Sequence, residues 1–141
     1  MNAVAKFSEI ELAFDFVSSG APTEHTAFLC IETGACHWHT ELGDNEEPLP
    51  DDILDSAKYI EIPHKNDLGL GKPLALTFAA QVLPADYDEV AGIFQRRGAY
   101  GRFKDLLERR EKLDGWYEFE NASQREALRE WCAANGINVE E

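Results

Sequence analysis

Apolar residues recur at helical spacing near the start of the chain and alternate with polar residues further on. Four of them share one face of a predicted helix: Phe7, Ile10, Phe14 and Val17. Ser8 is followed three residues later by Glu11, which is the spacing of a capping box. The pattern therefore predicts a helix that begins at Ser8 and ends at the Ser-Ser-Gly-Ala-Pro segment, residues 18–22.

The next segment alternates as the strands of a β-hairpin do. Residues 26–32 and 35–40 form two predicted strands joined at Thr33-Gly34. A two-residue turn would pair Leu29 with Trp38 and Ile31 with Cys36. One face of the hairpin then holds Leu29, Ile31, Cys36 and Trp38, and the other holds Phe28, Cys30, Glu32, His37 and His39. We expect Leu29 and Trp38 to be cross-strand neighbours in the core.

The rest of the chain predicts mostly helix. A short strand at 59–62 ends at Pro63, and Asp114-Gly115 predicts a turn. Helices are predicted over 73–83, over 86–97 with Gly98 as the stop, over 99–113, and from a capping box at Ser123 and Glu126 to Gly136. These elements indicate an α+β fold, a small antiparallel sheet built around the hairpin and packed against about four to five helices. We expect residues 1–141 to form a single domain.

The charge of the chain excludes several classes of partner. Its 141 residues include 27 acidic and 13 basic residues, a formal charge of −14. Such a field repels phosphate backbones and anionic lipid, which disfavours bulk nucleic-acid binding. The most apolar window, 74–83, is too short to cross a bilayer, and the amino terminus has no signal-peptide pattern. With three cysteines and no disulfide pattern, the sequence predicts a cytoplasmic protein without a membrane segment.

The hairpin carries residue types that bind zinc. Cys30, Cys36, His37 and His39 lie within ten positions of one another. The predicted register places Cys36 on the face opposite to both histidines, and a second ligand pair of the kind that structural zinc sites use is missing. We therefore expect no metal, and no motif in the sequence indicates another cofactor.

Two segments of opposite charge stand out. Residues 41–57 hold seven acidic and no basic residues, whereas residues 96–112 hold seven basic and three acidic residues. Aromatic side chains interleave with the basic ones, so this helix could present guanidinium groups to a ligand. The candidate contacts are Lys65, Arg96, Arg97, Tyr100 and Arg102. Alternatively, Asp105 with Arg109 and Glu108 with Lys112 form the i,i+4 pairs of an ordinary solvated face. We further predict that the two segments approach one another.

A third candidate lies directly after the predicted strand at 59–62. His64 and Asp67, with His39 of the hairpin, supply the residue types of general acid–base catalysis. The alternative is that Asp67 caps a helix while His64 and Lys65 lie at the surface.

Three stretches carry a resemblance to a known family. They are Ile62 to Leu68, the run from Phe94 to Arg109, and Trp116-Tyr117 before Glu130-Trp131-Cys132. In these stretches the chain resembles a bacterial family of small acidic cytoplasmic proteins that is catalogued as an uncharacterised protein family. The resemblance covers nearly the whole chain and implies no assigned activity, cofactor or catalytic residue.

Together these observations favour a non-enzymatic cytoplasmic interaction or regulatory protein that binds another protein. One alternative is an enzyme or binder that acts on a phosphorylated or nucleotide ligand through His39 or His64 and through Arg96 and Arg97. Another is an RNA-binding module that uses the basic helix 96–112.

Overall fold

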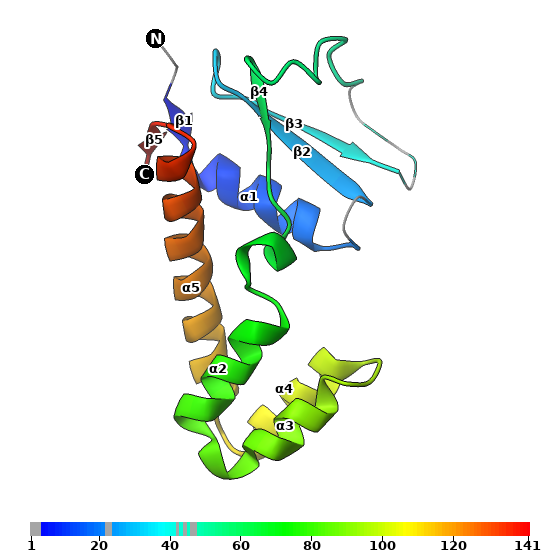
Figure 1. Ribbon diagram of the computed structural model, residues 1–141, viewed down its shortest axis with the longest axis vertical. Coiled ribbons are helices and arrows are strands. Elements are labelled where there is room, and N and C mark those ends of the chain that lie inside the picture. Colours follow the sequence, from blue (N-terminus) through cyan, green and yellow to red (C-terminus); the bar gives the residue numbers. More distant parts are fainter. Residues whose placement is uncertain (1–3, 22–23, 42, 44, 46–47) are drawn as a thin grey trace. The chain divides into compact units, whose positions relative to one another are not determined.

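The computed structural model describes residues 4–21, 24–41, 43, 45 and 48–141 of the chain. These residues divide into two compact units (Figure 1). The sheet unit contains residues 1–68 and 127–141, and the helical unit contains residues 69–126. The helix α5, Leu113–Ala134, supplies residues to both. The single-domain organisation stays a prediction.

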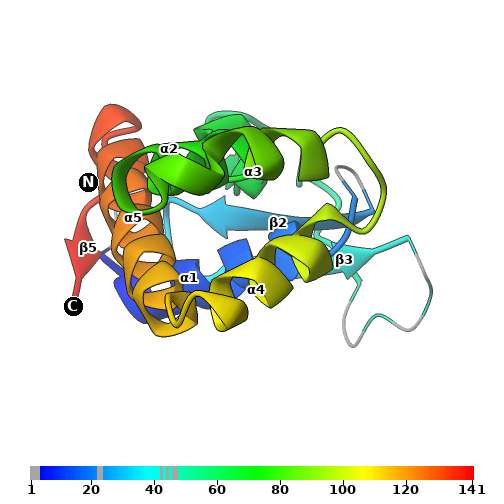
Figure 2. The same ribbon diagram turned by 90° about the horizontal axis from the view of Figure 1, so that it is seen from below.

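The sheet unit is built on a three-stranded antiparallel sheet in the order β3-β2-β4. Its strands are β2 (His25–Cys30), β3 (Cys36–Thr40) and β4 (Tyr59–Glu61), and α1 (Phe7–Ser18) packs against β2 and β3 (Figure 2). A short parallel pair, β1 (Ala5–Lys6) with β5 (Val139–Glu140), joins the two ends of the chain. A 3-10 helix, η1 (Lys65–Leu68), follows β4. The predicted α+β fold is confirmed.

Helix α1 has the predicted core stripe but a different start. Phe7, Ile10, Phe14 and Val17 are all buried, as the spacing predicts. The helix begins at Phe7, so Ser8 lies inside it and the predicted cap at Ser8 is wrong. The reason is the pairing of β1 with β5, which holds Lys6 extended and leaves the following residue to open the helix.

The hairpin forms, but its register differs by two residues from the prediction. Leu29 lies opposite Cys36, and Trp38 lies opposite Ala27. The connection is longer than two residues, because Cys30 donates its N–H to the Ala35 carbonyl across a loop at 31–35. A shift of two residues keeps the side chains of β2 and β3 on their predicted faces, whereas Ile31 and Glu32 lie in the connection. The predicted core pairing of Leu29 with Trp38 is wrong, since the Trp38 residue is 40% exposed.

The helical unit packs around an aromatic core. Its elements are α2 (Lys72–Val82), η2 (Pro84–Asp86), α3 (Tyr87–Ile93), α4 (Ala99–Arg109) and the first part of α5. Trp116 is fully buried, and its ring meets Phe78 and Phe103 edge to face at centroid distances of 5.4 and 5.0 Å. Such pairs add to the burial of the rings themselves. Tyr87, the first residue of α3, lies outside this core and is 36% exposed.

The last helix is continuous where the sequence predicts a turn. Asp114, Gly115 and Ser123 all lie inside α5, so the predicted turn and the second capping box are wrong. The chain turns earlier, at Glu111, which has a left-handed φ of 58°. Lys112 donates its N–H to the Leu107 carbonyl and Glu111 to that of Glu108, the two bonds of a Schellman motif.

Candidate partner-binding surface

The turn between α3 and α4 carries the basic candidates. Helix α3 ends at Ile93, earlier than the predicted end at Arg97. The N–H groups of Phe94, Gln95 and Arg96 still donate to carbonyls three or four residues back, so the chain unwinds gradually. Gly98, with φ of 71°, then reverses the chain directly before α4. Arg96 and Arg97 therefore lie on a turn and not on a helix.

An aromatic base supports this turn. The Phe94 ring meets the Tyr100 and Phe103 rings edge to face, at centroid distances of 5.2 and 5.4 Å. Phe103 is fully buried, and Tyr100 is half-buried. Burial raises the pKa of the Tyr100 phenol, and the carboxylate of Glu120 raises it further. Tyr100 therefore keeps its proton at neutral pH, and its ring packs against the Phe94 ring in the turn.

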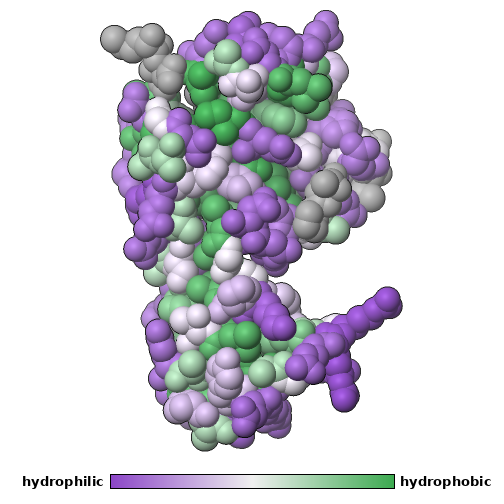
Figure 3. Space-filling model, viewed as in Figure 1, coloured by the Kyte–Doolittle hydropathy of each residue, from purple (hydrophilic) through white to green (hydrophobic). Residues whose placement is uncertain are grey.

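Three arginine side chains are exposed around these aromatic rings. We call Arg96, Arg97 and Arg102 the arginine surface. Figure 3 shows hydrophilic side chains that project from the turn between α3 and α4. No described residue forms a hydrogen bond or an ion pair with any of the three guanidinium groups. Their charges are therefore available to an external acceptor.

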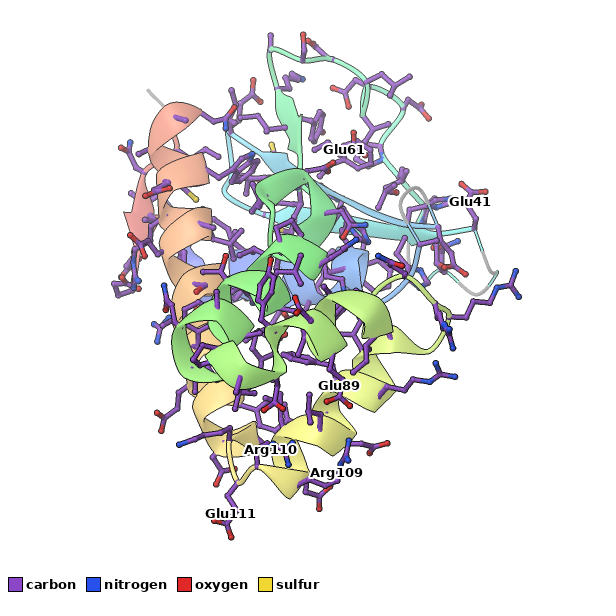
Figure 4. The ribbon with its side chains drawn as sticks, turned by 60° about the horizontal axis from the view of Figure 1, so that its bottom comes forward. Glu41, Glu61, Glu89, Arg109, Arg110 and Glu111 are labelled. Atoms are coloured by element: carbon purple, nitrogen blue, oxygen red, sulfur yellow. The ribbon has the colours of Figure 1, made fainter. Side chains whose placement is uncertain are left out.

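The arginine at the other end of α4 behaves differently. Arg110 donates two hydrogen bonds to the Asp86 carboxylate, at 3.0 and 3.1 Å. Figure 4 shows Arg109, Arg110 and Glu111 grouped where α4 ends. The Arg110 guanidinium holds the pKa of Asp86 below its ordinary value. This arginine has a structural partner, because it ties the end of α4 to η2.

The i,i+4 pairs that the sequence allows along α4 do not form. Neither Asp105 with Arg109 nor Glu108 with Lys112 makes an ion pair in the described structure. Asp105, Glu108 and Arg109 instead line a shallow depression in which two carboxylates accompany one guanidinium. The charges of α4 are therefore not neutralised along the helix itself.

His64 is buried, which corrects the prediction that it lies at the surface. The Asn66 N–H donates to its ring Nδ1 at 3.0 Å. Nδ1 therefore carries no proton, and Nε2–H donates to the Gly20 carbonyl at 2.9 Å. The Asp67 carboxylate accepts the His64 backbone N–H at 3.0 Å. His64 and Asp67 thus cap η1 reciprocally, as a capping box does.

These bonds engage both ring nitrogens of His64 with backbone groups, and a catalytic role of His64 stays a prediction. Lys65 is partly exposed, and its backbone N–H donates to the Ser18 hydroxyl at 3.1 Å. His39 lies on β3, with Nε2 3.2 Å from the Glu41 carboxylate. These residues belong to the sheet unit and the arginine surface to the helical unit, so a site that combines them stays a prediction.

The hairpin cysteines and histidines keep the predicted division between two faces. Cys36 lies on the α1 side, where burial, with a smaller effect of Glu9, raises the pKa of its thiol to about 11. His37 lies on the opposite face, edge to face with Tyr59 at 5.9 Å. Over the described ranges, no group of three potential metal ligands is close enough to hold an ion. The absence of a cofactor stays a prediction.

The acidic segment 41–57 is partly occupied by local contacts. Asp44, Glu46 and Glu47 lie outside the described residues. The Asp52 carboxylate accepts hydrogen bonds from the Lys58 ammonium at 3.0 Å and from the Tyr59 hydroxyl at 3.2 Å. The segment belongs to the sheet unit, so its predicted approach to the basic helix stays a prediction.

The sequence does not single out Phe94 as the residue that supports the turn between α3 and α4. The signal available was an aromatic residue four positions before Gly98, within a run that also holds Tyr100 and Phe103.

Within the described ranges, no helix is both long enough and apolar enough to cross a membrane. Comparisons with protein-family models, curated proteins and solved structures find no match.

Proposed function

We propose that the protein is an interaction module that binds an acidic segment of another protein through the arginine surface. The observation that carries this proposal is the contrast between paired and unpaired guanidinium groups. Arg110 is bound by Asp86, whereas the side chains of Arg96, Arg97 and Arg102 have no acceptor among the described residues. Guanidinium groups bind carboxylates through paired hydrogen bonds, which gives both affinity and orientation.

The rigidity of the turn supports this role. Two of the arginines stand on a turn whose Phe94 ring is packed against Tyr100 and Phe103. A fixed backbone lowers the entropy that is lost when the partner binds. The exposed guanidinium groups can then act together on one acidic segment.

The proposal is tested by the binding of a fluorescent oligoglutamate peptide, followed by anisotropy. We expect R96Q/R97Q/R102Q to weaken binding by about tenfold or more, since it removes the charged contacts. The matched control K6Q/K72Q/K112Q removes the same number of charges from other exposed positions, and we expect it to change affinity by about twofold or less. Circular dichroism confirms that both variants fold.

Two outcomes would contradict the proposal. Equal loss in the control and in the arginine variant would show that only net charge matters. Tighter binding of single-stranded RNA than of oligoglutamate would favour the RNA-binding alternative, because we expect RNA affinity weaker than roughly 10 μM at physiological salt. A partner recovered from cells by the native protein should likewise be lost with the arginine variant and kept with the control.

A further inference from the structure

The edge of strand β3 carries backbone groups that nothing in the described structure binds. The sheet order places β3 at an edge, with β2 as its neighbour. Two hydrogen bonds mark the ends of the β2-β3 pairing: the Cys30 N–H donates to the Ala35 carbonyl, and the Glu41 N–H donates to the Glu24 carbonyl. By the alternation of antiparallel ladders, His37 and His39 bond to β2. The N–H and C=O groups of Cys36, Trp38 and Thr40 therefore point outward.

One end of this edge is already closed by a side chain. The Thr40 N–H donates to the Asn45 amide oxygen at 2.8 Å, and the Asn45 amide donates to the Thr40 carbonyl at 3.2 Å. The amide thus imitates the backbone of a neighbouring strand. No described residue bonds the outward groups of Cys36 and Trp38 in the same way.

An apolar strip lies along this open part of the edge. Trp38 is 40% exposed, and its indole stacks on Phe16 of α1 at a centroid distance of 4.8 Å. Leu12, four residues before Phe16 and therefore on the same side of α1, is 56% exposed. An open strand edge beside exposed apolar side chains is the arrangement that binds an extended peptide as an added strand.

The charge around the edge determines which peptide fits. Glu9, in the first turn of α1, acts electrostatically on the Cys36 thiol, and the Glu41 side chain just beyond β3 is 70% exposed. The sheet unit as a whole contains seventeen acidic and four basic residues, a formal charge of −13. A field of this sign attracts cationic chains and repels acidic ones.

We propose that the β3 edge binds an extended, lysine- or arginine-containing segment of a partner protein by strand addition. Cys36 and Trp38 supply the backbone hydrogen bonds, Trp38 and Leu12 hold an apolar side chain, and the surrounding carboxylates select the basic residues. This surface is separate from the arginine surface, and it takes a ligand of the opposite charge.

The test uses a short fluorescent peptide of alternating lysine and valine. We expect saturable binding that is lost when the peptide is N-methylated along one edge and kept when it is N-methylated along the other. This difference arises because only one edge of an added strand bonds to the sheet. Equal loss with both peptides would overturn the proposal, and so would equal binding of a glutamate–valine peptide.

Protein variants locate the binding edge. We expect Trp38→Ala to weaken peptide binding by about tenfold or more, as for an aromatic anchor at an interface. Leu54→Ala, at an apolar residue that is 87% exposed in the same unit, is the matched control and should bind as the native protein does. R96Q/R97Q/R102Q should also bind the peptide normally, so this proposal and the proposed function fail independently. A stable dimer that Trp38→Ala dissociates would overturn the proposal, because a second copy would then occupy the edge.

Discussion

The two units of the chain differ most in how they distribute charge. The sheet unit holds nearly all of the negative charge, whereas the helical unit has nine basic and ten acidic residues, a formal charge of −1. The repulsion of polyanions expected from the net charge of −14 therefore arises mainly from the sheet unit. The basic residues of the helical unit lie in a nearly neutral surrounding, where local geometry decides which anion they bind.

The units also differ in how they use polar side chains. In the sheet unit, His64, Asp67, Asp52 and Asn45 bond to nearby backbone or side-chain groups. In the helical unit, an aromatic core fixes the fold and the arginine surface stays unpaired. A run of reactive residue types can therefore be structural, whereas exposed arginines without an acceptor are the better candidates for binding.

The largest expected change in the free energy of unfolding comes from replacing a tryptophan, Trp116 in the helical unit or Trp38 in the sheet unit. We expect Trp116→Ala to lower the free energy of unfolding by about 3 to 5 kcal/mol, because it leaves a cavity in the helical core. Trp38→Ala should cost clearly less, about 1 to 2 kcal/mol, since Trp38 is partly exposed. Urea denaturation followed by circular dichroism measures both values.

Trp116→Phe separates the effect of the lost side-chain volume from the effect of the buried indole N–H in the helical core. The Trp116 Nε1 is buried without a hydrogen-bond partner among the described residues. Trp116→Phe removes this N–H and keeps an aromatic ring, so it should cost less than half as much as Trp116→Ala. Equal costs for Trp116→Ala and Trp38→Ala would contradict the difference in burial between the two tryptophans.

The second prediction concerns thiol reactivity in the sheet unit. The pKa of Cys36 is raised from 9.0 to about 11, so at pH 8 its thiolate is about a hundredfold scarcer than in the unfolded chain. Alkylation of Cys36, followed by peptide mass spectrometry, should be slower by about that factor in the native protein. The folded chain should also lose stability between pH 9 and 11, where only the unfolded thiol is ionised. Fast native labelling would contradict the burial of this thiol.

The third prediction distinguishes the two candidate histidines of the sheet unit. His64→Ala removes the acceptor of the Asn66 N–H and the donor to Gly20, so it should cost about 2 kcal/mol of stability. His39→Ala, at a partly exposed residue paired only with exposed Glu41, should cost less than about 0.5 kcal/mol. A His64→Ala protein as stable as the native one would contradict the capping role of His64.

The fourth prediction concerns a small effect at the turn after α4. Glu111 has a φ of 58°, which costs a side-chain-bearing residue energy that glycine avoids. We expect Glu111→Gly to stabilise the chain by about 0.5 to 1 kcal/mol, measured by thermal unfolding. Gly136 occupies the corresponding position after α5, so Gly136→Ala should destabilise the sheet unit by a similar amount. A loss of stability in Glu111→Gly would contradict the geometry of the turn.

Sequence analysis predicts best where one local pattern decides the structure. The stripe of α1 and the two faces of the hairpin follow from spacing alone. Prediction from the sequence fails where contacts between residues far apart in the chain determine the local structure. The pairing of β1 with β5 moves the start of α1, and the bond of His64 to Gly20 joins residues 44 positions apart. Gly115 suggests a turn, but α4 ends in a Schellman motif at Glu111, and α5 then continues through Gly115.

For the candidate site, the sequence identifies the arginines but does not show which guanidinium groups have a carboxylate partner. The local spacing allows Asp105 and Glu108 to pair with Arg109 and Lys112, and these pairs do not form. The bond between Arg110 and Asp86 joins two elements and has no signal in local spacing. Which guanidinium groups remain unpaired therefore depends on the tertiary structure.

The most direct test of the account is a nuclear magnetic resonance titration of the arginine Nε–H signals with oligoglutamate. In the free protein, Arg110 should exchange its Nε proton most slowly of the four arginines compared, because that group donates to Asp86 at 3.0 Å. On titration, the signals of Arg96, Arg97 and Arg102 should shift together while that of Arg110 stays in place. If these three signals stay unchanged at saturation, or shift no more than that of Arg110, the account of the arginine surface is wrong.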